Sequence, residues 1–233
     1  MPQVTRLRTL IARHFNITND EADRIIGAGR VRVNGKSAPP AAKLELWEEV
    51  AVDGKIIRAG KPFVYIKFHK PRGIECTLNE AIADHLYTVF HHEERLYPVG
   101  RLDKDSEGLL IMTNDGEVFR NVAISEKEKE KEYLVTIDQP VSEEFLQLMA
   151  EGVVIMGQLT RPAKTFAVEN DPNSFRIILT QGLNRQIRRM CYKLGCKVTR
   201  LIRTRIVNVE LGTLEAGKWE PLSPEELRVL KSS

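Results

Sequence analysis

The stretch "RLDKDSEGLLIMTNDG", residues 101–116, joins an acidic turn to an apolar run and admits two interpretations. Counted from Asp103, its acidic residues and its first glycine fall on the first positions of an EF-hand calcium loop. The last position of such a loop needs a bidentate glutamate, and Asn114 stands there instead. An EF-hand loop also lies between two helices, whereas this turn runs into the strand-like "LLIM" at 109–112. We therefore expect no metal here, and the other interpretation, a turn that carries a single functional aspartate at Asp103, stays open.

The chain around this stretch has the pattern of strands interrupted by a helix. Alternating or apolar runs predict strands at 63–68 and 131–137 and a further strand within 175–182. The segment 140–152 predicts a helix, because it begins with proline and ends at a glycine. Together with the strand at 109–112, these elements predict an α+β fold with a mixed, mostly antiparallel sheet.

The first part of the chain predicts a helical hairpin followed by a β-ribbon. Helices are expected at 5–15 and 20–29, the second opened by a Thr-x-x-Glu capping box. An Asn-Gly pair at 34–35 and an Asp-Gly pair at 53–54 then predict two tight hairpin turns.

The segment "IRAGKP" at 57–62 interrupts this pattern with glycine and proline and is the predicted linker. We expect a small domain at 1–58 and a larger one at 63–233. The length of 233 residues, with 42% of them hydrophobic, is sufficient for a large domain plus a small one.

Composition restricts the compartment and the cofactors. No apolar run reaches the length of a membrane span, and the N-terminal "MPQVTRLRTL" has no apolar signal core. The three cysteines, Cys76, Cys191 and Cys196, form no CxxC pair, which favours reduced thiols in the cytoplasm. The short apolar runs make a membrane partner unexpected. The sequence contains no GxGxxG, no P-loop and no Cys/His cluster, so no cofactor is expected either.

Charge is unevenly distributed along the chain, although the formal net charge is only +3. Residues 6–36 contain seven Lys or Arg against three Asp or Glu. Residues 181–209 contain eight Lys or Arg and no acidic residue. Either segment alone fits a solvated helix face, but the two together indicate a polyanionic partner.

The first basic segment resembles an S4 RNA-binding domain. The resemblance rests on the helix at 20–29, on "GRVRVNGK" at 29–36 and on "VDG" at 52–54, in this order. The connection "APPAAKLELWEE" at 38–49 departs from the usual tighter form and leaves the fine shape of the ribbon open. The resemblance implies a cationic face that contacts RNA phosphates. Its expected RNA-contacting residues are Arg24, Arg30, Arg32 and Lys36, accompanied by Arg6, Arg8 and Arg13.

Four motifs in the rest of the chain resemble the RsuA branch of the pseudouridine synthases, in its large-subunit type. They are "HKPRGIECT" at 69–77, "GRLDKDSEGLL" at 100–110, "KEYLVTI" at 131–137 and "GLNRQIRRM" at 182–190. Members of this branch isomerise a uridine of RNA to pseudouridine without a cofactor. The resemblance therefore implies an isomerase with a pseudouridine-synthase catalytic domain.

The resemblance also implies roles for individual residues. Asp103 takes the position of the essential carboxylate, Arg188 that of its ion-pair partner, and Tyr133 that of the tyrosine packed against the target uracil. Whether Asp103 attacks C1′ or removes a ribose proton stays open. A base in a stem must be flipped out to reach such a site. The residues of this domain expected to contact the RNA are Arg101, Leu102, Arg185 and Arg189.

The expected substrate is a stem-loop of large-subunit ribosomal RNA, bound by a monomer. Transfer RNA or small-subunit RNA stays open as a second target. A rival interpretation is a non-catalytic RNA-binding factor of ribosome assembly that uses the same basic segments. A pure binding protein has no need of Asp103, Tyr133 and Arg188 in these positions, so the catalytic interpretation is favoured.

Overall fold

The computed structural model of the chain describes residues 5–45, 48–116, 118 and 129–232. The chain divides into two compact units, Met1–Phe63 and Val64–Ser233, each with hydrophobic core residues of its own. In the described part of the chain, no helix is long and apolar enough to cross a membrane.

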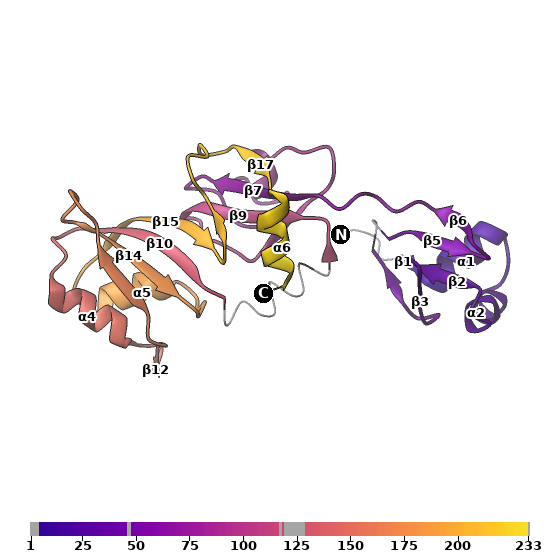
Figure 1. The fold of residues 1–233 in the computed structure, drawn as a ribbon, viewed down its shortest axis with the longest axis horizontal. Helices are drawn as coiled ribbons and strands as arrows, with labels where there is room; N and C mark the ends of the chain where they lie inside the picture. The colour runs from indigo at the N-terminus through magenta and orange to yellow at the C-terminus, as the bar shows by residue number, and fades with distance from the viewer. Residues whose placement is uncertain (1–4, 46–47, 117, 119–128, 233) are drawn as a thin grey trace. The chain divides into compact units, whose positions relative to one another are not determined.

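The first unit combines two helices with a small antiparallel sheet (Figure 1). The sheet has the strand order β3-β2-β5-β6, and a separate pair joins β1 to β4. The elements are β1 (Thr5–Arg6), α1 (Leu7–Phe15), α2 (Asn19–Gly27), β2 (Val31–Val33), β3 (Lys36–Ser37), β4 (Lys43–Leu44), β5 (Val50–Val52) and β6 (Lys55–Arg58).

Local signals fix the ends of these elements. The Thr18 hydroxyl accepts a hydrogen bond from the Glu21 amide, and the Glu21 carboxylate accepts one from the Thr18 amide, so the predicted capping box is present. Both predicted hairpin turns are also confirmed, because Asn34-Gly35 and Asp53-Gly54 have positive φ at each residue.

Apolar residues at helical spacing form the core of the first unit. Leu7 and Ile11 of α1 and Ile26 of α2 are buried with Val31 and Val50 of the sheet. These positions lie on one face of each helix, so that face covers the sheet and the opposite face is left to polar residues.

The second unit is built on a nine-stranded sheet with the order β13-β14-β10-β15-β9-β7-β17, to which β16 and β8 add at β15 and β9 (Figure 1). The described pairings are antiparallel except that of β15 with β9, which is parallel. The predicted mixed, mostly antiparallel sheet is therefore confirmed. The strands are β7 (Tyr65–Lys70), β8 (Tyr97–Val99), β9 (Glu107–Thr113), β10 (Lys131–Ile137), β13 (Lys164–Ala167), β14 (Ser174–Leu179), β15 (Val198–Ile206), β16 (Val209–Glu210) and β17 (Trp219–Pro221).

Helices and a short hairpin accompany this sheet. Met149 of α4 and Met190 of α5 are buried with Val135 and Phe175 of the sheet, whereas Leu230 of α6 belongs to a separate core cluster. These elements are α4 (Glu143–Glu151), α5 (Gln186–Lys193), α6 (Pro224–Ser232), the 3-10 turn η1 (Leu86–Thr88) and the hairpin strands β11 (Val154–Ile155) and β12 (Gln158–Leu159).

Predicted and observed strand limits agree at β10 and differ elsewhere. The strand predicted at 63–68 runs from Tyr65 to Lys70, because its pairing with β9 extends to Gly108. The strand predicted within 175–182 ends at Leu179, where its pairing with β10 stops.

Strand β9 is buried on both faces. Leu109 and Ile111 belong to one core cluster, and Leu110 and Met112 belong to another. The continuous run "LLIM" follows from this double burial, since a strand with one face in water would alternate apolar and polar residues. The turn that carries Asp103 is thus continuous with a buried strand.

Gly108 permits the parallel contact between β9 and β15. Its φ is 109°, and a Cβ built there would lie 2.4 Å from the backbone oxygen of Arg203. A side chain does not fit at that distance, so glycine is required for the two backbones to approach. This junction fixes the chain just after the Asp103 turn.

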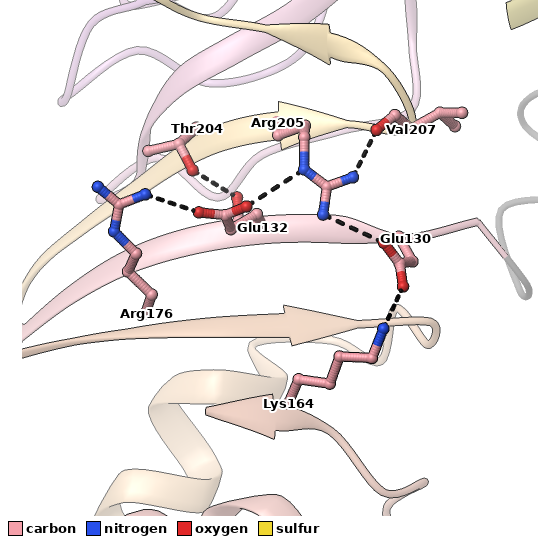
Figure 2. Close-up of polar contacts among 7 residues, drawn as sticks. All are labelled: Glu130, Glu132, Lys164, Arg176, Thr204, Arg205 and Val207. Atoms are coloured by element: carbon pink, nitrogen blue, oxygen red, sulfur yellow. Dashed lines mark hydrogen bonds and ion pairs between the residues drawn. The ribbon is translucent and has the colours of Figure 1, made fainter. Parts of the chain in front are cut away.

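Carboxylates on β10 and just before it link the charged side chains of neighbouring strands (Figure 2). Arg205 of β15 lies 3.2 Å from Glu132 and 3.1 Å from Glu130. Arg176 of β14 lies 3.0 Å from Glu132, and Lys164 of β13 lies 3.0 Å from Glu130. The cations of this cluster are therefore neutralised by carboxylates.

Candidate active site

A pocket with a volume of about 850 Å³ lies in the second unit where the four sequence motifs meet. Asp103 of the turn before β9, Tyr133 of β10 and Arg185 just before α5 line it. The strand order β10-β15-β9 brings these distant parts of the sequence together. Its lining also includes Cys76, Arg101, Leu102, Lys131 and Arg203.

The guanidinium of Arg203 holds the turn that carries Asp103. Nε of Arg203 donates to the backbone oxygen of Leu109 at 2.8 Å, and Nη1 donates to that of Arg101 at 3.3 Å. Arg203 is only 2% exposed, so these hydrogen bonds are shielded from water. Within the turn, the Ser106 amide donates to the backbone oxygen of Asp103 at 3.0 Å. The turn is therefore fixed at both ends and across its middle.

Arg185 is the cation that faces Asp103. Its Nη1 lies 4.0 Å from Oδ2 of Asp103 and 3.7 Å from Oδ2 of Asp105. Arg185 has a left-handed backbone with φ of 52° and precedes the first residue of α5. The Arg185 and Asp103 side chains are 42% and 28% exposed, so solvent screens the pair and its contribution to stability is small.

The predicted ion pair between Asp103 and Arg188 is not found among the described residues. Nη2 of Arg188 donates to the backbone oxygen of Asp105 at 2.8 Å, and Nη1 donates to that of Val198 at 3.3 Å. Helical spacing places Arg188 within α5, against the backbone of the turn, whereas Arg185 lies just outside the helix and approaches the carboxylate. Burial lowers the pKa of Arg188. Arg188 therefore supports the turn instead of pairing with Asp103.

Tyr133 lies on the wall of the pocket. In the sheet it is paired with Ile177 of β14 and with Arg203 of β15, and its side chain packs against the core cluster that contains Met190 of α5. The register of β10 and β15 shifts between Glu132 and Tyr133. Such irregularities change the direction of nearby side chains, and this one lies next to Tyr133, which lines the pocket.

A buried lysine near Asp103 was not singled out from the sequence. Lys70 is 0% exposed. Burial lowers its pKa to about 8, and nearby groups, among them Cys76 and Asp103, partly oppose that shift. The signal was present in the sequence, because alternation along 65–70 places Lys70 on the same inward face as Phe68.

Of the other residues predicted to contact RNA in the second unit, some line the pocket and one does not. Arg101 and Leu102 line the pocket, with Arg101 exposed and Leu102 buried. Arg189 does not line it, and its Nε donates to the backbone oxygen of Asn184 at 3.0 Å.

Among the predicted RNA-contacting residues of the first unit, Arg24, Arg30, Arg32 and Lys36 are exposed, whereas Arg8 is half-buried and lies 3.6 Å from Asp23. Nε of Arg30 lies 2.9 Å from Oδ1 of Asp53, so this cation is already paired. Nη1 of Arg32 donates to the Ser37 hydroxyl at 2.9 Å. For Arg24 and Lys36 the described part of the structure contains no ion pair, which leaves these two free to meet phosphates.

The acidic residues of the turn do not converge on one point. Asp103 and Asp105 face Arg185, whereas Glu107 accepts a hydrogen bond from Nε of Arg200 at 2.5 Å. Within the described ranges there is no group of three or more side chains placed to hold a metal ion.

The sequence profile of the RNA pseudouridylate synthases matches residues 64–193, a range that contains Asp103, Tyr133 and Arg185. The chain therefore belongs to the RNA pseudouridine synthase family, whose members are isomerases.

Within this family the chain is of the RluF type of the RsuA branch. It is 41% identical to the dual-specificity RNA pseudouridine synthase RluF of Salmonella typhi, over 96% of this chain and 77% of that protein. It is 30% identical to the ribosomal small subunit pseudouridine synthase A of Pasteurella multocida, over 95% and 97%. A crystal structure of a pseudouridylate synthase matches with a TM-score of 0.68 at 29% identity, covering 97% of this chain and 99% of that one.

Proposed function

We propose that this chain converts one uridine in a stem-loop of large-subunit ribosomal RNA to pseudouridine, as a cytoplasmic monomer. The observation that carries the proposal is that Asp103, Tyr133 and Arg185 line one and the same pocket. A relative named as a ribosomal small subunit synthase supports ribosomal RNA as the substrate class. A relative named as dual-specific leaves room for a second RNA, such as transfer RNA.

The chemistry needs one ionised carboxylate and a closed place for a base. The reaction breaks the bond between C1′ and N1, turns the uracil and joins C5 to C1′. C5 loses its proton and N1 gains one, so electrons balance without a redox partner. Asp103 is the carboxylate, whether it attacks C1′ or removes a ribose proton. Arg185, 4.0 Å away, compensates negative charge in the pocket.

The remaining pocket residues position the base. A uridine must leave its stem to reach Asp103. Tyr133 offers an aromatic face to the uracil, and Arg101 and Leu102 border the route by which the nucleotide enters. Arg188 supports the backbone of the turn, so it acts on the reaction through Asp103 and is a positioning residue.

The first unit serves as an S4-like RNA-binding domain, with residues 1–58 as that domain and 63–233 as the catalytic domain. Support comes from the helix pair, the two confirmed hairpin turns and the exposed cations Arg24 and Lys36. Phosphate contacts of this kind set affinity and register without reading sequence.

Release of tritium from RNA that carries 5-tritiated uridine tests the proposal, because C5 loses its hydrogen in the reaction. The rival, a ribosome-assembly factor, would bind the same RNA and release no tritium. Pseudouridine mapping in total RNA from cells with and without the gene then identifies the uridine. A large-subunit position that disappears on deletion supports the proposed substrate, whereas a loss confined to transfer RNA contradicts it.

A further inference from the structure

The structure sorts the eight cations of residues 181–209 by their partners. Arg200 pairs with Glu107, and Arg205 pairs with Glu130 and Glu132 (Figure 2). Arg203 is buried and bonded to backbone oxygens. The other five line a second pocket beside the active site: Arg185, Arg188, Arg189, Lys193 and Lys197.

This second pocket, called the side pocket here, has a volume of about 620 Å³. It is lined by α5, the β11–β12 hairpin, the start of β15 and Arg72, and Asp105 is its single acidic lining residue. Two exposed apolar side chains stand at it: Tyr192 is 78% exposed and Met156 is 68% exposed. Six cations against one carboxylate, next to an uncovered aromatic ring, are a combination that suits a nucleotide.

Few of these cations are neutralised within the protein. Arg185 is 3.7 Å from Asp105, but the described structure contains no ion pair for the other five cations of the side pocket. Nε of Arg188 is buried and has no hydrogen-bond partner among the described residues. In the Glu130–Glu132 cluster, by contrast, each cation meets a carboxylate. The uncompensated charge therefore belongs to the side pocket.

The side pocket adjoins the active site at Arg185, the one described residue that lines both. Arg188 bonds to the backbone oxygen of Asp105, two positions after Asp103. A strand whose target base enters the active site would therefore lead its neighbouring nucleotide past Arg185 into the side pocket.

We propose that the side pocket binds the RNA nucleotide next to the target uridine, with its phosphate on the cations and its base against Tyr192. This inference rests on the proposed RNA substrate and adds a second binding site to it. Aromatic rings accept any base, and phosphate contacts carry no sequence information. The side pocket thus sets the register of the strand and leaves the choice of sequence to other contacts.

The test uses the full chain and a fluorescein-labelled RNA stem-loop with a uridine-rich loop, titrated over a range of salt. Tyr192→Ala should weaken binding about 5- to 150-fold, the range for one base stacked on one aromatic ring, whereas Tyr192→Phe should bind like the wild type. Lys193→Gln with Lys197→Gln should lower the slope of log K against log salt by roughly 0.7 to 0.9 for each phosphate that these lysines neutralise in the wild type.

Matched controls lie elsewhere on the second unit. Phe166 is 51% exposed on β13, and Lys218 is exposed just before β17. Phe166→Ala and Lys218→Gln should bind RNA like the wild type. Wild-type affinity and salt slope in the Tyr192→Ala and double lysine variants would contradict the proposal that the side pocket binds RNA. Losses of affinity in the two control variants as large as those in the side-pocket variants would contradict it as well.

The two proposals fail in distinguishable ways. A wild-type chain that binds the stem-loop but releases no tritium from any RNA would refute the proposed function, while the binding comparison would still decide the side pocket. Normal turnover with normal binding by the side-pocket variants would refute the side pocket alone. An abasic site beside the target uridine should remove the effect of Tyr192→Ala, since no base is left to stack.

Discussion

Nη1 of Arg185 faces both carboxylates of the turn before β9, 4.0 Å from Asp103 and 3.7 Å from Asp105. Arg188, on α5, bonds to the backbone of the same turn instead. Compensation of charge and support of the backbone are thus divided between two arginines. The two roles predict different effects of mutation.

Arg185→Gln should lower turnover about tenfold or more and leave stability nearly unchanged, because an exposed ion pair contributes little to folding. Arg188→Gln should lower the free energy of unfolding by about 1 to 3 kcal/mol, since two backbone oxygens lose a charged donor. Tritium release and urea unfolding measure the two quantities. The opposite pattern, with stability lost only in Arg185→Gln, would contradict the division of roles.

Gly108→Ala should destabilise the second unit strongly, by at least about 2 kcal/mol, because the added Cβ meets the backbone of Arg203 at a positive φ. The matched control is Gly157→Ala in the β11–β12 hairpin, where φ is also positive but no atom lies within 4 Å. Its cost should be about 1 kcal/mol. Equal unfolding midpoints for the two variants would show that the close approach to Arg203 is unimportant.

The sequence predicted elements whose signals are local. The capping box at Thr18, the hairpin turns and the strand at 131–137 depend on neighbouring residues, and the structure has them as predicted. The strand predicted at 109–112 is also present, within the longer strand β9.

The sequence did not predict features that depend on distant partners. Arg185 takes the place expected for Arg188 because of a left-handed residue before α5, and helical spacing carries no trace of that conformation. The parallel junction at Gly108 pairs it with Arg203, far along the chain. The basic run at 181–209 looked uniform, yet carboxylates from β9 and β10 neutralise part of it.

Lys70 should make stability depend on pH between about 8 and the ordinary value of 10.5. In this window the unfolded chain binds the proton that the folded chain has lost, so the free energy of unfolding rises with pH, by up to about 3 kcal/mol. Below this pH window Lys70 is charged in both the folded and the unfolded chain, so the folded chain bears the full free-energy cost of burying its charge. Lys70→Met should remove the dependence. Urea unfolding of both proteins at each end of the window checks this, and a constant difference between them would contradict it.

Neutralising Arg24 and Lys36 together should weaken RNA binding and reduce the salt slope by roughly 0.7 to 0.9 for each phosphate that the two residues neutralise. Lys55→Gln, an exposed lysine of the same unit, serves as the control and should leave the slope unchanged. Filter binding across a salt series gives the slopes. An unchanged slope in the Arg24→Gln, Lys36→Gln variant would remove these residues from the RNA-binding surface.

The central claim is that Asp103 is the catalytic carboxylate, and Asp103→Asn tests it most directly because the side chain keeps its shape and loses its charge. Asp171→Asn is the control. The Asn173 amide donates a hydrogen bond to Oδ1 of Asp171, and the amide oxygen of an asparagine can still accept this hydrogen bond. Tritium release from 5-tritiated uridine RNA should fall by at least about 100-fold in Asp103→Asn, with RNA affinity within a few-fold of the wild type, and should be normal in the control. Turnover by Asp103→Asn close to that of the wild type would contradict the account.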